Sequence, residues 1–474
     1  MTARREISRQ EFLKISGRAA AGAAVGSTLL LATASGHCGG GRETVLITDF
    51  GARGDGRHDD TKAILKAIDE MFEAGGGVVK VPQTEAFYKT TRAINLKTDM
   101  LHPVHIVGEG DKSFLKNVHQ GGHEGVVFRP GSLTAGDHKF AGPGQMWHKI
   151  EVAEAGQDRI FPRSGRYERG DMLLIASEER VTPGGGRSHM WWPLNPQIAI
   201  VEGVDERGGL KLSDPLLYDY RNAEVAVFPH GASHGSVSNL RLEYETPAFN
   251  AFAGGGNYGM TFRNLNVTRG YGVFGGNGYA YALIENIRGN PYGKGLELAY
   301  FTHSCTIRNI DIEVAPASEA PAGKIRSLFY LAQGSHHCLV EDVRVDHKDR
   351  LPEQLGTVFG HGGLILGCHD NVLRRYTSLS ERFALGLNIS GPADKPVLNN
   401  RLEDSTVIAK GAKYALRSSS GGGGNHEIVY NRLEAGETSV LLSSGTNNTL
   451  VANNVVPQGV KDYGKNNTVR HNSE

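Results

Sequence analysis

A short pattern of apolar and polar positions recurs along the second half of the chain. Its form is apolar–any–Asn/Asp–apolar–any–apolar, and VSNLRL at 237–242 is the first copy. Successive third positions are separated by 18 residues (Asn453 to His471) to 33 residues (Asn309 to Asp342). One short strand in every repeat of about 20 to 30 residues is typical of a solenoid of stacked parallel strands. The third positions are Asn239, Asn264, Asn286, Asn309, Asp342, Arg375, Asp404, Asn431, Asn453 and His471.

Asparagine suits the corners of such coils because its short polar side chain tolerates the left-handed backbone conformation. We therefore interpret Asn264 and Asn286 as members of a ladder of stacked side chains. The pairs Asn447–Asn448 and Asn466–Asn467, which come just before their strands, are interpreted in the same way. These residues are predicted to be structural.

The pattern changes near the N-terminus, where residues 61–74 predict one amphipathic helix. Asp60 and Thr61 supply helix-start residues, and the glycines at 75–77 end the helix. A single helix before a solenoid would cover the open end of the stack. The apolar residues that recur at helical spacing are Ile64, Leu65, Ile68, Met71 and Phe72.

Several short motifs lie around this helix: Asp49-Phe50-Gly51-Ala52, Gly54-Asp55-Gly56, Asp59-Asp60-Thr61, Gly75-Gly76-Gly77 and Val81-Pro82. With them the segment resembles the N-terminal segment of the pectate lyase-like superfamily, the group that contains rhamnogalacturonase and epimerase-type proteins. That family folds as a right-handed parallel β-helix, and right-handed connections are the default between parallel strands. The resemblance implies an all-β, single-stranded right-handed parallel β-helix with an N-terminal capping helix.

Residues 1–34 are predicted to be an export signal. A basic region precedes an apolar run at 19–34 that ends in a small-x-small pattern. Ser8 to Lys14 resembles a twin-arginine signal with Gln10 in place of the second arginine, so both the twin-arginine and the Sec routes stay open. The expected location is periplasmic or extracellular, and Cys38 follows a poor lipobox, which argues against a lipoprotein anchor.

The predicted mature chain has a Gly-rich linker at 35–44 and one β-helix domain at 45–474. A β-rich insertion at about 111–232 interrupts the repeats with short alternating strands. The 63 glycines of the 474-residue chain fit a fold with frequent tight turns. Homo-oligomerisation stays open.

Charge excludes one class of partner. Residues 1–34 hold 5 of the 51 basic and 2 of the 51 acidic residues, which leaves 46 basic and 49 acidic residues, a net charge of about −3. Nucleic-acid binding usually needs a broad basic surface, so a nucleic-acid partner is not expected. After residue 34, no stretch approaches the roughly 20 apolar residues of a membrane span.

The cysteines do not predict a metal site. Cys305 and Cys338 precede their repeat strands by the same spacing, so they are expected to stack in adjacent coils. Buried free thiols are favoured there, and a disulfide stays open. There is no CxxC pair. No metal or cofactor is predicted; calcium would need clustered carboxylates, and only Glu341, Asp342, Asp346 and Asp349 cluster.

Candidate chemistry lies where the repeats lengthen, between Asn309 and Asp404, because long insertions in repeat proteins become loops, often on the binding face. Acid–base chemistry on a sugar needs at least two ionisable groups near the scissile bond. His361 in Gly-His-Gly resembles an element of polygalacturonases, and Asp346 with Asp349 is the pair that an inverting hydrolase would use. The predicted catalytic residues are Asp346, His347, Lys348, Asp349, Arg350 and His361.

Other polygalacturonase elements, N-x-D and G-D-D, are absent, so a lyase is favoured over a glycoside hydrolase of the polygalacturonase or rhamnogalacturonase type. β-Elimination from a uronate needs a base for the C5 proton and a cation for the carboxylate. A Lys or Arg with a depressed pKa, or a His/Tyr pair, is a candidate for the base. A non-catalytic carbohydrate-binding β-helix is the third reading. The predicted substrate-binding residues are Arg269, Tyr271, Tyr292, Lys294, Arg326 and Arg382.

Overall fold

The computed structural model describes residues 44–474 except 121–124, 126, 132–147, 178–179, 182–191, 194, 229–230, 246–249, 300, 316–327, 348–361, 366, 381–386, 392–395, 420 and 422. The predicted export signal, the Gly-rich linker and Cys38 lie outside these residues. No helix in the described part of the chain is long and apolar enough to cross a membrane.

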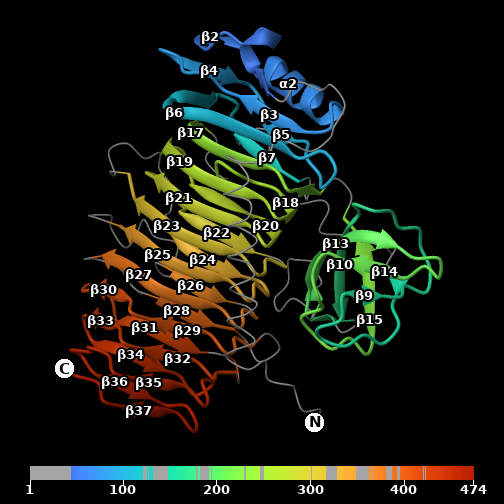
Figure 1. Cartoon of the computed structure of the whole chain (residues 1–474). Helices are drawn as coiled ribbons and strands as arrows, with labels where there is room; N and C mark the ends of the chain where they lie inside the picture. Colours follow the sequence, from blue (N-terminus) through green and yellow to red (C-terminus); the bar gives the residue numbers. More distant parts are fainter. Residues whose placement is uncertain are drawn as a thin grey trace.

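Two long parallel sheets build a β-helix in which successive coils stack from the N-terminal to the C-terminal end (Figure 1). In the described residues the first sheet has 17 strands and the second has 10. Both pair coil to coil in register, as in Val237↔Phe262 and Phe262↔Ile284. The predicted fold class is therefore confirmed.

The first sheet takes one long or two short strands from each coil. Its strands are β1 (Thr44–Leu46), β2 (Asp55–Asp59), β3 (Gly77–Lys80), β4 (Phe87–Thr90), β6 (Val104–Asn117), β17 (Ser236–Tyr244), β19 (Thr261–Arg269), β21 (Leu283–Gly289), β23 (Thr306–Glu313), β25 (Leu339–Asp346), β27 (Val372–Ser380), β29 (Arg401–Glu403), β30 (Thr406–Ala409), β32 (Glu427–Val429), β33 (Arg432–Ala435), β35 (Leu450–Ala452) and β37 (Thr468–Arg470).

The second sheet takes one strand from each coil. Its strands are β16 (Ala232–Ser233), β18 (Gly255–Tyr258), β20 (Phe274–Ala280), β22 (Leu296–Ala299), β24 (Phe329–Ala332), β26 (Gly362–Ile365), β28 (Leu387–Ser390), β31 (Tyr414–Ser419), β34 (Thr438–Leu442) and β36 (Val460–Asp462). A separate pair joins β5 (Ile94–Leu96) to β7 (Phe128–Pro130).

The first sheet bends sharply in each coil at a residue with positive φ. Nine of the ten predicted third positions have φ between 50° and 58°. The exception is Asn431, where the preceding Tyr430 takes the corner at φ 60°. The predicted ladder is confirmed, since Asn264 donates to Asn239 at 2.8 Å and Asn286 donates to Asn264 at 3.0 Å.

Polar ladders also run inside the coils. Asn431 Oδ1 accepts from the Ser405 N–H at 2.9 Å, and Asn454 Oδ1 accepts from the Asn431 N–H at 2.8 Å. Burial with backbone partners explains why Asn431 leaves the corner to Tyr430. Cys305 and Cys338 are buried free thiols at corresponding places on neighbouring coils, as predicted. They begin a second inner ladder, which consists of Cys305, Cys338, Asn371, Asn400, His426, Thr449 and Asn467.

The N-terminal end of the stack is covered by α2 (Thr61–Glu73), which follows the short 3-10 helix η1 (Ile47–Phe50) (Figure 1). Ile64, Ile68 and Met71 are buried and belong to the same apolar core as the β-helix interior. The predicted helix is thus confirmed, and its apolar face explains its position, because the end of a solenoid exposes core side chains.

An antiparallel sheet stands beside the solenoid, between β7 and β16 in the sequence (Figure 1). Its six strands are β8 (His148–Lys149), β9 (Arg159–Ile160), β10 (Met172–Ser177), β13 (Gln197–Val204), β14 (Leu210–Leu212) and β15 (Ala223–Val227), and β11 (Arg180–Val181) pairs with β12 (Trp192–Pro193). These strands fall within the range 111–232 expected for the insertion.

Strand alternation gives this insertion two apolar faces. Leu173 and Ile175 of β10 point into the insertion's own core. Met172 and Leu174 belong instead to a cluster that includes Tyr258 of the second sheet, so the insertion docks on the β-helix.

Candidate functional site

The strands of the first sheet end along one edge of the molecule. Glu243 of β17 is the neighbour of Arg269 in β19, and Glu313 of β23 is the neighbour of Asp346 in β25. The residues after these strands therefore stack along the same edge. This edge is where most of the described residues predicted for catalysis and substrate binding lie.

Four predicted substrate-binding residues meet there and form what we name the corner cluster: Arg269, Tyr271, Tyr292 and Lys294. They come from two neighbouring coils joined by backbone hydrogen bonds. The Tyr292 N–H donates to the Gly270 carbonyl at 3.0 Å, and the Lys294 N–H donates to the Tyr271 carbonyl at 2.7 Å.

Glycine lets the ring of Tyr271 lie close to the next coil. A Cβ on Gly293 would come 2.2 Å from Cε2 of Tyr271. From the preceding coil, the buried Tyr244 hydroxyl donates to the Gly272 carbonyl at 2.6 Å and accepts from the Gly272 N–H at 2.5 Å. The segment that carries Tyr271 is thus held from both sides.

The corner cluster mixes cations with phenols. Burial raises the pKa of Tyr292, while Arg269, which shares a hydrogen bond with it, lowers that pKa and Glu243 raises it. Arg269 is exposed, whereas Lys294 is buried and forms an ion pair with Glu297. On balance the pKa of Tyr292 is raised, because burial is the largest effect. The cluster therefore offers an accessible cation beside a tyrosine whose pKa this cation lowers against burial.

Of the predicted catalytic residues, the structure describes Asp346 and His347. The Asp346 carboxylate pairs with Arg344 at 2.5 Å, and the His347 side chain is fully buried. Both lie on the edge that carries the corner cluster, but on a later coil. Their catalytic role stays a prediction. The predicted residues Lys348, Asp349, Arg350, His361, Arg326 and Arg382 lie outside the described residues.

A second group of polar side chains lies at the other side of each coil, where the insertion docks. His303, His336 and His369 are neighbours in a parallel ladder, and their rings stack at 5.1 Å and 4.9 Å between centroids. The ring of Tyr218, from the insertion, meets His336 edge-on at 5.5 Å. We name His303, His336, His337, His369, Asp370 and Tyr218 the histidine seam.

Hydrogen bonds assign the tautomers of this seam. The Pro196 carbonyl at 2.7 Å can only accept, so His336 Nε2 carries the proton and Nδ1 is an acceptor. His337 Nδ1 lies 2.8 Å and the Tyr218 hydroxyl 2.9 Å from this acceptor, so the two compete for its single lone pair. Donation by His337 Nδ1 would place the acceptor lone pair of His337 on Nε2. His303 has the opposite tautomer, because its Nε2 accepts from the Ile198 N–H at 2.8 Å.

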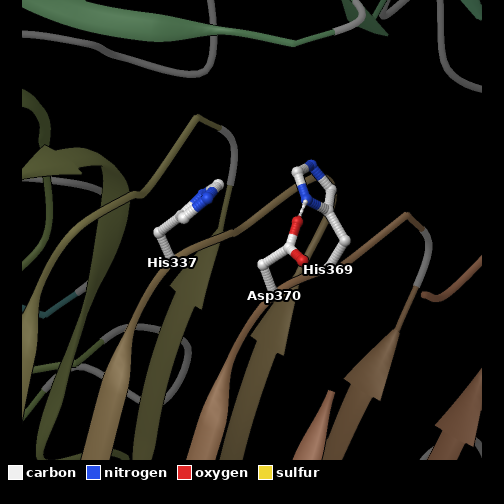
Figure 2. Close-up of side chains that lie close together, drawn as sticks. All are labelled: His337, His369 and Asp370. Carbon is white, nitrogen blue, oxygen red and sulfur yellow. Dashed lines mark hydrogen bonds and ion pairs between the residues drawn. The ribbon is translucent and has the colours of Figure 1, made fainter. Parts of the chain in front are cut away.

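His337, His369 and Asp370 project from neighbouring coils toward one region (Figure 2). Their ligand-type atoms lie within 4.8 Å of one another, and His369 Nδ1 bonds Asp370 Oδ2 at 2.6 Å. Burial lowers the pKa of His337 to about 4. Burial opposes ionisation of Asp370, but hydrogen bonds from His369 and Asn399 and the nearby histidines bring its pKa to about 2.

The sequence singled out the residues of the corner cluster, whose substrate-binding role stays a prediction, but not the histidine seam. The signal for the seam was present as His303, His336 and His369, spaced 33 residues apart like the strands that follow them. Tyr218 carried no such signal, because its place against the histidines depends on how the insertion docks.

The fold defines the chain as a parallel β-helix protein, which is the fold that the resemblance to the pectate lyase-like superfamily implied. Over 91% of its length the chain is similar to the tailspike of Pseudomonas phage phi297, with 13% identity, a TM-score of 0.55 and 75% of that chain covered. This likeness concerns the fold alone.

Two short matches to proteins of Azotobacter vinelandii are closer in sequence. One stretch of 39 residues, 8% of this chain and 5% of the relative, is 56% identical to alginate lyase 7. Another of 71 residues, 14% of this chain and 6% of the relative, is 42% identical to mannuronan C5-epimerase AlgE2. The chain thus matches only a small part of the length of these curated relatives, and no protein-family profile matches it.

Proposed function

We propose that the chain is an exported lyase that cleaves an acidic, uronate-containing polysaccharide by β-elimination at the corner cluster. The observation that carries this proposal is the meeting of Arg269 with Tyr292 on neighbouring coils, beside Tyr271. A cation next to a phenol answers the two needs of the reaction, which are charge neutralisation at the carboxylate and a base for C5.

The proposed reaction proceeds without an outside reagent. Arg269 binds the uronate carboxylate and stabilises the negative charge that develops when the C5 proton leaves. Tyr292, as the phenolate, takes that proton; the C5–H electron pair forms the C4–C5 double bond, and the C4–O4 bond breaks. Tyr271 gives its proton to the departing oxygen. Lys294, paired with Glu297, holds the turn that positions Tyr271.

The names of the two relatives support the same substrate class. One is an alginate lyase and the other a mannuronan C5-epimerase. Elimination and C5 epimerisation both begin with removal of the proton at C5 of a uronate. Epimerisation is therefore the second candidate function: the same cluster would act, and a proton would return to C5 from the opposite face without breaking the C4–O4 bond.

The decisive experiment incubates the purified chain with a panel of uronate polysaccharides. A lyase produces unsaturated ends that absorb in the ultraviolet. New reducing ends without that absorbance would indicate the glycoside hydrolase instead, and a changed C5 configuration by NMR without cleavage would indicate the epimerase. Binding with no chemical change on the whole panel would overturn the enzyme reading in favour of a carbohydrate-binding β-helix.

The matched variants are Tyr292→Phe and Tyr430→Phe. Tyr292→Phe removes the proposed base and should lower kcat/KM by about 10²-fold to 10⁴-fold. Tyr430 takes a corner on a distant coil and is 58% exposed, so Tyr430→Phe should retain full activity. Full activity of Tyr292→Phe would place the reaction away from the corner cluster.

A further inference from the structure

The histidine seam contains three potential metal ligands, His337, His369 and Asp370, which have no part in the proposed elimination. His337 lies one residue after a rung of the histidine ladder, and His369 and Asp370 occupy the corresponding places on the next coil. His337 and Asp370 both have positive φ, at 54° and 55°, so the same corner of two coils presents them. The register of the β-helix therefore places the three side chains together.

We propose that His337, His369 and Asp370 bind a divalent transition-metal ion, such as Zn²⁺, at the junction of the β-helix and the insertion. Two imidazoles and one carboxylate are a ligand set that such ions prefer, and three protein ligands leave a position for water. The site is separate from the corner cluster, so this proposal does not rest on the proposed function.

The second layer of contacts favours metal binding. A ligating histidine usually donates its other ring N–H to a protein acceptor, which fixes the tautomer. The Pro196 carbonyl fixes His336 Nδ1 as an acceptor, 2.8 Å from His337 Nδ1, and donation by His337 would leave its Nε2 lone pair for a metal. The hydroxyl of Tyr218 lies 2.9 Å from the same His336 Nδ1. Two groups of the insertion therefore contact the histidine next to one ligand.

Geometry and access are compatible with a bound ion. The three ligand atoms lie within 4.8 Å of one another, and a tetrahedral zinc site with bonds of about 2.05 Å would place them about 3.3 Å apart. The ion would replace the hydrogen bond of 2.6 Å between His369 and Asp370. The side chains of His369 and Asp370 are 18% and 30% exposed, so an ion can reach them. One carboxylate is too few for calcium, which takes six to eight oxygen ligands.

The test is titration of the full, EDTA-treated chain with Zn²⁺ by calorimetry and with Co²⁺ by visible absorption. We expect one ion per chain, the absorption bands of a four- or five-coordinate cobalt site, and an upward shift of the melting temperature with Zn²⁺. Ca²⁺ at the same concentration should leave the melting temperature unchanged.

Variants distinguish binding at this site from binding by the rest of the chain's 19 histidines. Asp370→Asn preserves the shape of the side chain and should weaken Zn²⁺ binding by at least tenfold, and His337→Gln should do the same. His471→Gln changes an exposed histidine on the last coil and should bind like the unchanged chain. Equal Zn²⁺ affinity in Asp370→Asn and in the unchanged chain would overturn the proposal, as would no binding by the unchanged chain. Circular dichroism checks that each variant is folded. If His337→Gln does not fold, Asp370→Asn alone decides the outcome.

Discussion

At the scale of single residues, the corner cluster depends on two short-range effects. Arg269 opposes the effect of burial on Tyr292, and Gly293 leaves room for the ring of Tyr271. Each effect depends on one residue, so a single substitution can remove it while the fold of the coil is kept.

The first prediction concerns Arg269→Gln. Burial raises the pKa of Tyr292 and Arg269 lowers it, so removing the cation should raise that pKa further. If the phenolate is the base, kcat/KM for elimination rises with pH, and this rise should move to higher pH in the variant. The measurement is the pH profile of kcat/KM.

The control for this profile is Arg432→Gln, which removes an exposed arginine paired with Glu434 on a distant coil. Its profile should match that of the unchanged chain. An Arg269→Gln profile with a lower amplitude but the same pH dependence would mean that Arg269 only binds substrate.

The second prediction concerns Gly293→Ala. The new methyl group would meet the Tyr271 ring at 2.2 Å, so the ring must shift. Overpacking of this kind costs about 1–3 kcal/mol of the free energy of unfolding. A displacement of about 1 Å at the site can lower kcat/KM by about 10²-fold. Chemical denaturation and steady-state kinetics measure the two effects.

Gly203→Ala is the matched change, because a Cβ on Gly203 meets nothing within 4 Å. It should leave both stability and kinetics close to those of the unchanged chain. Unaltered kinetics in Gly293→Ala would show that the position of Tyr271 does not matter for the reaction.

At the scale of elements, the inner ladders give each coil hydrogen bonds that do not depend on strand pairing. His426 occupies one rung between Asn400 and Thr449, and its Nδ1 accepts from the Asn400 N–H at 3.2 Å. Burial lowers the pKa of His426 to about 4. This rung is therefore the acid-sensitive member of a ladder that otherwise contains groups that do not ionise near pH 5.

The third prediction follows from this rung. The pKa of a histidine in the unfolded chain is near 6.5, so between pH 6.5 and 4 the unfolded state binds the extra proton. His426 thus contributes stability that is complete above about pH 6.5 and is lost as the pH falls toward 4, by up to about 1.4 kcal/mol per pH unit. His426→Asn should keep the acceptor and make the loss on acidification smaller, as measured by urea unfolding at several pH values.

His471→Asn serves as the comparison, because His471 is exposed at the last corner of the stack. Its acid dependence should equal that of the unchanged chain. Identical acid dependence in His426→Asn and the unchanged chain would contradict the assignment of this rung.

At the scale of the whole molecule, the insertion and the solenoid meet through both apolar packing and specific hydrogen bonds. Met172 and Leu174 pack against the second sheet, while the backbone at Pro196 and Ile198 bonds the stacked His336 and His303. The apolar contacts stabilise the docking of the insertion, and the histidine hydrogen bonds fix its position along the stack.

The fourth prediction tests this docking with His303→Phe. The variant keeps a ring in the ladder but leaves the buried Ile198 N–H without its acceptor, which costs about 1–3 kcal/mol. Hydrogen exchange of the amides of β13 should become faster, while exchange in β35 should stay unchanged. His303→Gln, which restores an acceptor, should recover part of the protection. If β13 is as well protected in His303→Phe as in the unchanged chain, packing alone holds the insertion.

The sequence predicted the solenoid because its signal is local and repeated. Each copy has inward apolar residues and a corner residue that tolerates positive φ, and coil stacking forces all copies into one register. The miss at Asn431 shows the limit of this logic. Asparagine fits both a corner and an inner ladder, and only the Ser405 N–H and the Asn454 side-chain oxygen, which bond Asn431, decide between them.

The corner cluster was also accessible from the sequence, since Arg269, Tyr271, Tyr292 and Lys294 follow successive repeat strands and the register alone brings them together. The histidine seam was accessible only in part. Its three ladder histidines share the repeat spacing, but the tautomers of His303 and His336 depend on Ile198 and Pro196, more than 100 residues earlier in the chain.

The sequence by itself therefore determined the β-helix, its capping helix and the edge where side chains from neighbouring coils gather, because these follow from periodicity and nearest-neighbour stacking. Only the tertiary structure decided where the insertion docks and what it contacts. That arrangement is set by the match between an apolar face of one sheet and the flank of another, and by long-range hydrogen bonds that leave no periodic trace in the chain.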